Sequence, residues 1–68
     1  MIQSLARGIE ILSILERMES AGVTEIAEEL GVDKSTASRL LQTLKEYDMV
    51  RLDRHTKKYR LGFRILYL

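Results

Sequence analysis

The segment from Val23 to Leu44, VTEIAEELGVDKSTASRLLQTL, constrains the fold of this chain more than any other part. It predicts two short helices joined at Gly31, because glycine ends a helix in the left-handed conformation at little cost. Two helices that cross closely through a short turn need small and apolar residues at fixed positions. The residues that meet this need are Ala27, Gly31, Val32, Ala37 and Leu40. The pattern is typical of a helix-turn-helix.

The second of these helices is expected to run from about Lys34 to Tyr47, with Asp33 as its N-cap. Its apolar residues fall in one narrow arc, and the opposite face is rich in hydroxyls and positive charge. Hydroxyls and backbone N–H groups at a helix start suit phosphate oxygens, and an arginine can bond a guanine edge with two hydrogen bonds. The face therefore predicts contact with the major groove of duplex DNA through Lys34, Ser35, Thr36, Ser38, Arg39 and Gln42. The alternative is a solvated face, which usually carries Glu and Lys four residues apart; the N-terminal half of this face has no such pair.

The charge of the chain is divided between its halves, which the net charge of +1 conceals. Residues 1–33 hold two Lys or Arg against seven Asp or Glu, a balance of −5, whereas residues 34–68 hold nine against three, a balance of +6. This asymmetry indicates a polyanionic partner for the C-terminal half, although the charges could also serve only to solvate a surface. The absence of cysteine excludes a disulfide framework and a thiolate metal site. No apolar run approaches the ~20 residues of a membrane span, so we expect a cytoplasmic protein.

The first helix is expected from about Ser4, its N-cap, to Glu19, with Gly22 taking the left-handed turn after it. One apolar stripe recurs at three- and four-residue spacing and is predicted to face the core: Leu5, Ile9, Leu12 and Leu15. Ile11, Ile14 and Met18 lie on a second flank. This flank indicates either a helix buried on several sides or a subunit interface. The next helix is expected over about 25–30, with Thr24 as its N-cap.

After the third helix the apolar period changes from 3.6 to 2, which predicts a β-hairpin over 50–61 that turns through residues 54–57. Gly62 is expected to start a further helix. Basic residues crowd the tip and edge of the hairpin: Arg54, His55, Lys57, Lys58 and Arg60. Such a wing is expected to meet the DNA backbone or minor groove, unless the charges only prevent strand-to-strand aggregation. His55 is the only histidine, and no second metal ligand or nucleophile accompanies it.

The sequence resembles the N-terminal DNA-binding domain of the IclR-type transcriptional regulators of bacteria and archaea. The resemblance covers nearly the whole chain, and its more specific motifs are KST-x-x-RLL from Lys34 to Leu41 and YRLG from Tyr59 to Gly62. Other matching positions are Ser4, Leu5, Arg7, Ile9, Leu12, Thr24 to Ala27, Leu30, Gly31, Leu44 and Val50.

The resemblance implies a winged helix-turn-helix that binds operator DNA as a homodimer or tetramer. It adds Arg7, near the DNA backbone, and Thr24 to the candidate DNA contacts, besides Arg54, Lys57 and Lys58 of the wing. In that family the first helix and the helix after the wing help to dimerise the domain. The expected interface residues are therefore Ile11, Ile14, Met18, Phe63, Leu66 and Tyr67. A ligand-binding domain normally follows, and a small-molecule effector is expected only with it.

The sequence thus predicts one mainly α domain over 1–68, a three-helix bundle with a two-stranded wing, in which a linker helix begins at about 62–68. The expected function is sequence-specific binding of double-stranded DNA by a prokaryotic transcriptional regulator, with no enzymatic activity, metal or cofactor. A winged-helix module that binds protein instead of DNA is the alternative. In that case the apolar flank of the first helix would dock the partner.

Overall fold

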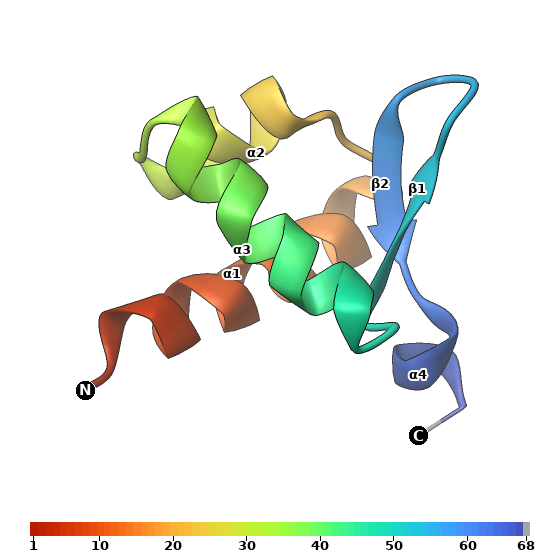
Figure 1. Ribbon diagram of the computed structural model, residues 1–68, viewed down its shortest axis with the longest axis horizontal. Coiled ribbons are helices and arrows are strands. Elements are labelled where there is room, and N and C mark those ends of the chain that lie inside the picture. Colours follow the sequence, from red (N-terminus) through yellow and green to blue (C-terminus); the bar gives the residue numbers. More distant parts are fainter. Residues whose placement is uncertain (68) are drawn as a thin grey trace.

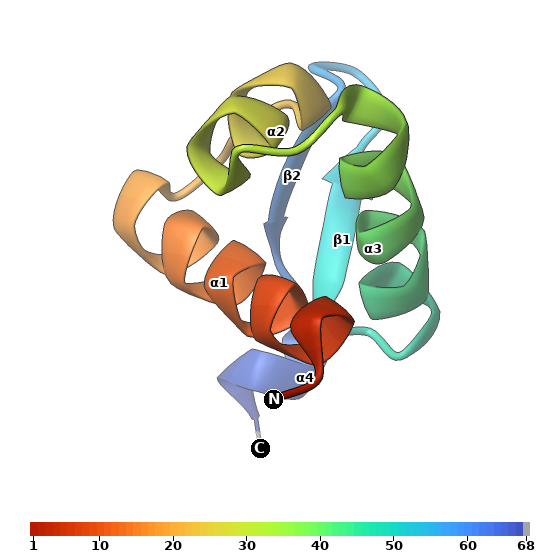
Figure 2. The ribbon, with the colours of Figure 1, turned by 90° about the vertical axis from the view of Figure 1, so that its left-hand side faces the viewer.

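The helix-turn-helix is present in the computed structural model of the chain, which describes residues 1–67 except the side chain of Leu66. Three helices come first: α1 (Gln3–Met18), α2 (Val23–Leu30) and α3 (Lys34–Glu46). They are followed by the strands β1 (Val50–Asp53) and β2 (Lys58–Leu61) and a short helix α4 (Phe63–Leu66). The helices pack around one side of the hairpin, as Figures 1 and 2 show. The predicted winged helix-turn-helix is confirmed.

The turn between α2 and α3 follows the predicted chemistry. Gly31 takes a left-handed φ of 72°, and its N–H reaches the carbonyl oxygens of Ala27 and Glu28 at the end of α2. The N–H of Val32 also donates to Ala27, at 3.1 Å. Ala27 is buried where the two helices approach, so its small side chain permits the close crossing.

The two strands form an antiparallel hairpin in which Val50 pairs with Leu61 and Asp53 pairs with Lys58. The four-residue turn over 54–57 lies where the sequence predicts it, and Lys57 takes a left-handed φ of 64° at its end. The loop between α1 and α2 extends this sheet, because Ala21 and Tyr59 exchange backbone hydrogen bonds of 3.1 and 2.8 Å. The wing is therefore fixed to the helical part by its second strand as well as by side chains.

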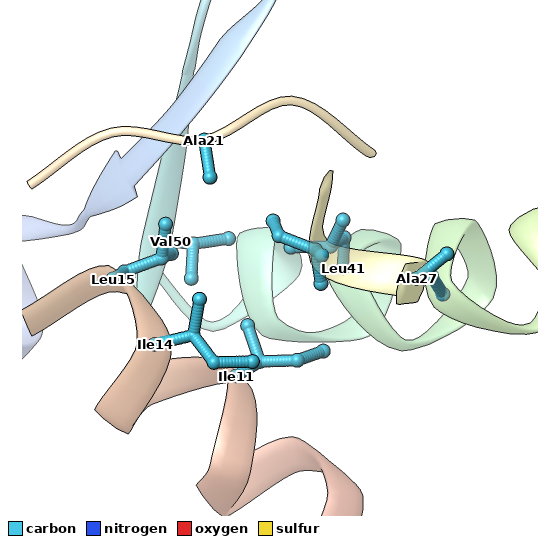
Figure 3. Packing of buried hydrophobic residues seen from close by; sticks show 9 residues of the cluster. Ile11, Ile14, Leu15, Ala21, Ala27, Leu41 and Val50 are labelled. Carbon is cyan, nitrogen blue, oxygen red and sulfur yellow. The ribbon is translucent and has the colours of Figure 1, made fainter. Parts of the chain in front are cut away.

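The core lies where the C-terminal half of α1 meets α2, α3 and the sheet (Figure 3). Its largest fully buried side chains come from each of these elements: Ile11, Leu15, Ile26, Leu41 and Val50. No buried side chain in the described part of the chain is polar or charged. The fold is therefore held by apolar packing, at roughly 25 cal/mol for each Å² of apolar surface removed from water.

The predicted orientation of α1 is wrong in its N-terminal half. Leu5 and Ile9 were expected in the core but are 60% and 56% exposed, whereas Ile11 and Ile14 are 0% and 6% exposed. The reason is that α2, α3 and the sheet enclose the second half of α1, whereas its first turns face the second half of α3 across an open apolar groove lined by Leu5 and Ile9. The interpretation of Ile11 and Ile14 as interface residues is corrected: both belong to the core of this chain. Met18 is half-buried and packs against the same core.

Three predicted helix ends also differ. Ile2 and not Ser4 precedes α1, and the left-handed turn after that helix is made by Glu19 (φ 68°), because α1 ends before it reaches Gly22. Gly22, with an extended φ of −81°, is the N-cap of α2. Its N–H donates to the Glu25 carboxylate at 2.9 Å, so that Thr24 lies inside the helix instead of capping it.

Helix α4 is attached to the turn that leaves α3. The N–H groups of Gly62 and Arg64 donate to the carbonyl oxygens of Met49 and Asp48, at 2.8 and 3.1 Å. This approach leaves no room for a side chain at Gly62, where a Cβ atom would lie 2.2 Å from the Asp48 oxygen. The Arg51 guanidinium also lies over the Phe63 ring, 5.0 Å from its centre. The predicted start of a helix after Gly62 is confirmed, and residue 68 lies outside the described part.

Two substitutions on α1, one at a buried and one at an exposed isoleucine, test the orientation of this helix. We expect Ile11→Ala to lower the free energy of unfolding by about 2–5 kcal/mol, because it leaves a cavity in the core. We expect Ile9→Ala on the same helix to lower it by less than about 1 kcal/mol, because that side chain is already more than half exposed. Urea denaturation monitored by circular dichroism measures the free energy of unfolding of both variants. Equal losses would contradict this orientation of the helix.

Candidate nucleic-acid interface

The first turns of α3 present the residues that the sequence predicts for DNA contact. Lys34, Ser35, Ser38, Arg39 and Gln42 are exposed, and Thr36 is half-buried. The opposite side of the helix carries Ala37 and Leu41, both fully buried, which holds α3 on the core. One face of a rigid helix therefore offers a lysine, an arginine, an amide and several hydroxyls to solvent. Such groups can donate to phosphate oxygens and to the acceptor edges of bases.

Asp33 organises the start of this face. It is the N-cap of α3, and its backbone oxygen accepts from the N–H of Ala37 at 3.1 Å. Its carboxylate accepts two side-chain hydrogen bonds, at Oδ2 from the Ser35 hydroxyl and at Oδ1 from the Thr36 hydroxyl. These two hydrogen bonds, with smaller contributions from the backbone N–H groups of Asp33 and Thr36, lower the pKa of Asp33 to about 2. The carboxylate is therefore ionised at neutral pH, and it holds two of the predicted phosphate donors.

The wing places its basic residues around a tight turn. Arg54, Lys57 and Lys58 are exposed. The Asp53 carboxylate accepts from the backbone N–H of His55 at 2.9 Å and of Thr56 at 3.3 Å, and these bonds lower its pKa. The Asp53 carbonyl accepts from the N–H of Lys57 at 2.7 Å. The turn is thus fixed by the carboxylate and the backbone oxygen of Asp53, so that the basic side chains project from a defined support.

The two basic regions lie on the same side of the molecule but apart from each other. In both views the tip of the wing and the N-terminal end of α3 are in the upper part, and Figure 1 shows them at the right and the left of it; α4 and both termini lie at the lower end (Figures 1 and 2). Thr24 is exposed on the first turn of α2. Arg7 is half-buried on α1, whose N-terminal end lies at the lower side, so it is not brought together with the start of α3.

An apolar groove lies between the exposed turns of α1 and the second half of α3. It has a volume of about 440 Å³ and is lined mainly by Leu5, Ile9, Leu12, Leu40, Leu44 and Met49. Of the residues expected in a subunit interface, Phe63 and Tyr67 are 58% and 82% exposed, with ring centres 6.4 Å apart. The side chain of Leu66 lies outside the described part.

The sequence interpretation missed two features of this surface. It assigned Asp33 a capping role only, although hydroxyls two and three residues after an aspartate lie within reach of its carboxylate at a helix start. It also placed Leu5 and Ile9 inside, because periodicity alone does not say how far a helix extends beyond its neighbours.

Within the described residues no group of three or more His, Asp or Glu side chains is placed to hold a metal ion. No helix among residues 1–67 is both long and apolar enough to cross a membrane.

The family model of the IclR helix-turn-helix domain matches residues 4–54, which include α1, α2, α3 and β1. The chain belongs to this family. It is 37% identical over 66 residues to the HTH-type transcriptional regulator TsaQ1/TsaQ2 of Comamonas testosteroni, a match that covers 97% of this chain and 24% of the relative. It is 41% identical over 51 residues to the transcriptional repressor IclR of Escherichia coli, covering 74% of this chain and 19% of the repressor.

A solved structure of an IclR-type transcriptional regulator from Alicyclobacillus acidocaldarius has the same fold. It superposes with a TM-score of 0.92 at 37% identity, covering 97% of this chain and 27% of that protein. Because this match covers 97% of the chain, it includes the second strand of the wing and the start of α4, which lie beyond the residues matched by the family model.

The chain spans about a quarter of the length of the curated relatives it matches. These relatives are transcriptional regulators and not enzymes, and the domain that this chain shares with them is the helix-turn-helix. Both the predicted family and the predicted class of function, DNA binding in transcription regulation, are confirmed.

Proposed function

We propose that this IclR-type domain reads a specific operator in the cytoplasm, with the N-terminal half of α3 in the major groove and the wing on the DNA backbone or in the minor groove. Arg39 and Gln42 are assigned to base edges, and Lys34, Ser38 and Thr24 to phosphates. Arg54, Lys57 and Lys58 of the wing neutralise further phosphates. Arg7 is left out of this assignment, because the N-terminal end of α1 lies at the other end of the molecule from the start of α3 and the tip of the wing.

The observation that carries this proposal is the separation of the two faces of α3. Ala37 and Leu41 are fully buried, so the direction of the exposed face is fixed by the core, and Arg39 lies on that exposed face. The guanidinium group can form two hydrogen bonds with O6 and N7 of guanine, which discriminates against other bases by about 1–3 kcal/mol. An exposed arginine on a rigid helix is therefore well suited to direct base recognition.

The first prediction concerns base recognition by Arg39. We expect Arg39→Ala to weaken binding to a duplex selected from a random library by roughly 5- to 150-fold, because one bidentate base contact is lost. Binding to a random-sequence duplex should fall much less, since only one charge is removed. Fluorescence anisotropy titrations on both duplexes measure the difference. An equal loss on the two would contradict base recognition by this residue.

The second prediction concerns the wing. We expect Lys57→Ala/Lys58→Ala to lower affinity for every duplex sequence and to reduce the slope of log affinity against log salt by about 2, because each neutralised phosphate contributes about 0.9. Titrations at salt concentrations between roughly 50 and 200 mM measure this slope, because the affinity for DNA depends strongly on salt in that range. Glu46→Gln, an exposed charge change near the far end of α3, is the control. A slope equal to that of the unchanged protein would remove the wing from the interface.

We further propose that the domain acts as a homodimer. Leu5 and Ile9 beside the apolar groove, Phe63 on α4 and Tyr67 directly after it are large apolar side chains exposed at the lower end of the molecule. Burying them against a second copy removes apolar surface from water and leaves the α3 face and the wing free. A two-fold dimer presents two recognition helices to half-sites about one DNA turn apart.

The third prediction tests this assembly. We expect Leu5→Glu/Ile9→Glu to shift the protein from dimer to monomer in sedimentation equilibrium without loss of helical signal, because both side chains lie outside the core. Glu10→Gln, an exposed change on the same helix, should leave the dimer intact. A wild-type chain that sediments as a monomer at high concentration would contradict this interface.

A further inference from the structure

The hydrogen bonds at the start of α3 create a competition that DNA binding must resolve. The hydroxyl protons of Ser35 and Thr36 point to the Asp33 carboxylate, one on each oxygen. A phosphate oxygen accepts hydrogen bonds but has none to donate at neutral pH. Each hydroxyl can therefore serve either Asp33 or a phosphate, but not both with its single proton. Two of the residues that the sequence predicted as phosphate donors are therefore already engaged.

The negative charge of the Asp33 carboxylate also weakens contact with a phosphate. Asp33 is exposed and ionised, and it lies at the end of α3 that enters DNA in the proposed function. A phosphate brought close to it experiences repulsion that offsets attraction by Lys34 and the helix N-terminus. Binding that relies on the phosphate backbone alone is therefore weakened at this point.

From these observations we propose that Asp33 is a specificity-determining residue. It lowers the affinity for DNA that contacts the start of α3 only through its phosphate backbone. Where the amino group of a base faces Asp33, the carboxylate accepts a hydrogen bond from it and this loss of affinity is removed. This inference rests on the proposed placement of α3 in the major groove. Two hydrogen bonds use about half of the acceptor sites of a carboxylate, so Asp33 can keep Ser35 and Thr36 while it accepts another donor.

The DNA groups that can supply such a donor are few. In the major groove they are the amino groups of cytosine N4 and adenine N6, whereas guanine and thymine present acceptors or a methyl group there. A correct site turns the carboxylate from a repulsive group into an acceptor of a base hydrogen bond. On an unrelated sequence the repulsion remains. Asp33 therefore widens the gap in affinity between the operator and other DNA.

The test compares Asp33→Asn with a control that removes the same charge at the other end of the helix. Asp48→Asn is that control, because Asp48 is exposed beyond the C-terminal end of α3. The 13 residues of α3 separate the two positions by about 20 Å, more than twice the ~8 Å over which charges act at physiological salt. Asparagine also suits both backbone positions, as an N-cap and at the left-handed φ of 60° found at Asp48.

Both variants are titrated with a random-sequence duplex and with a duplex selected by the wild-type protein from a random library. We expect Asp33→Asn to bind the random duplex roughly 3- to 10-fold more tightly and to steepen its salt slope by about 1. Its affinity for the selected duplex should stay the same or fall, so that the specificity ratio falls. Asp48→Asn should change both affinities by less than about 2-fold.

A second comparison isolates the hydroxyls from the charge. In the wild-type background Ser35→Ala/Thr36→Val should change random-duplex affinity little, because the hydroxyls are held by Asp33. In the Asp33→Ala background, where both hydroxyls are released, the same pair of substitutions should weaken binding several-fold. Circular dichroism checks that each variant is folded.

Unchanged random-duplex affinity and salt slope in Asp33→Asn would overturn this inference while leaving the proposed function intact. A gain of equal size on both duplexes would also overturn it, because Asp33 would then act as a general charge without a role in specificity. A wild-type chain that binds no duplex would instead overturn the proposed function, and this inference with it.

Discussion

The burial of one half of α1 is the constraint on which the rest of the structure depends. Ile11 and Leu15 contact a core that also receives Ile26 from α2, Leu41 from α3 and Val50 from the wing. Helices α2 and α3 and strand β2 therefore pack directly against the first helix, whereas β1 contacts α3 and β2, and α4 contacts β1 (Figure 3 shows the shared core). Because α3 can bury only its Ala37 and Leu41 side in this core, its opposite side is directed outward. The recognition surface is a consequence of the packing.

Rigidity at the proposed interface comes from backbone hydrogen bonds more than from side-chain ion pairs. The wing is joined to the α1–α2 loop through Ala21 and Tyr59, and its turn is fixed by Asp53. The ion pair between Arg17 and Glu29, at 2.8 Å, is exposed and contributes at most about 1 kcal/mol. This ion pair uses none of the basic residues of the C-terminal half, most of which are exposed and free to meet an anionic partner. A protein that binds DNA through a preformed surface loses less conformational entropy on binding.

Asp33 shows how a structural residue can also affect recognition. The Asp33 carboxylate lies at the positive end of the α3 dipole, where a negative charge stabilises the helix. It also accepts hydrogen bonds from the hydroxyls of Ser35 and Thr36 and so restrains them. A helix start made only of donors would hold any phosphate backbone, and a regulator must leave most of the genome unoccupied. In the proposed role, one negative charge among these donors lowers the affinity for DNA of any sequence more than the affinity for the operator. We assign the apolar groove beside Leu5 and Ile9 to a separate proposed task, the association of two copies.

The sequence by itself determined the element order, the Gly31 turn, the exposed Lys34 to Gln42 face and the hairpin, because these depend on local chemistry and on periods of 3.6 and 2 residues. It also carried enough family-specific residues to indicate the IclR type. It did not determine which flank of α1 is buried, since Ile9 and Ile11 are equally apolar and only the positions of α2, α3 and the sheet distinguish them. Nor did it show that Asp33 engages both hydroxyls, which requires the three side chains to converge at the start of a folded helix. Local pattern specified the elements, and long-range packing decided their exposed faces.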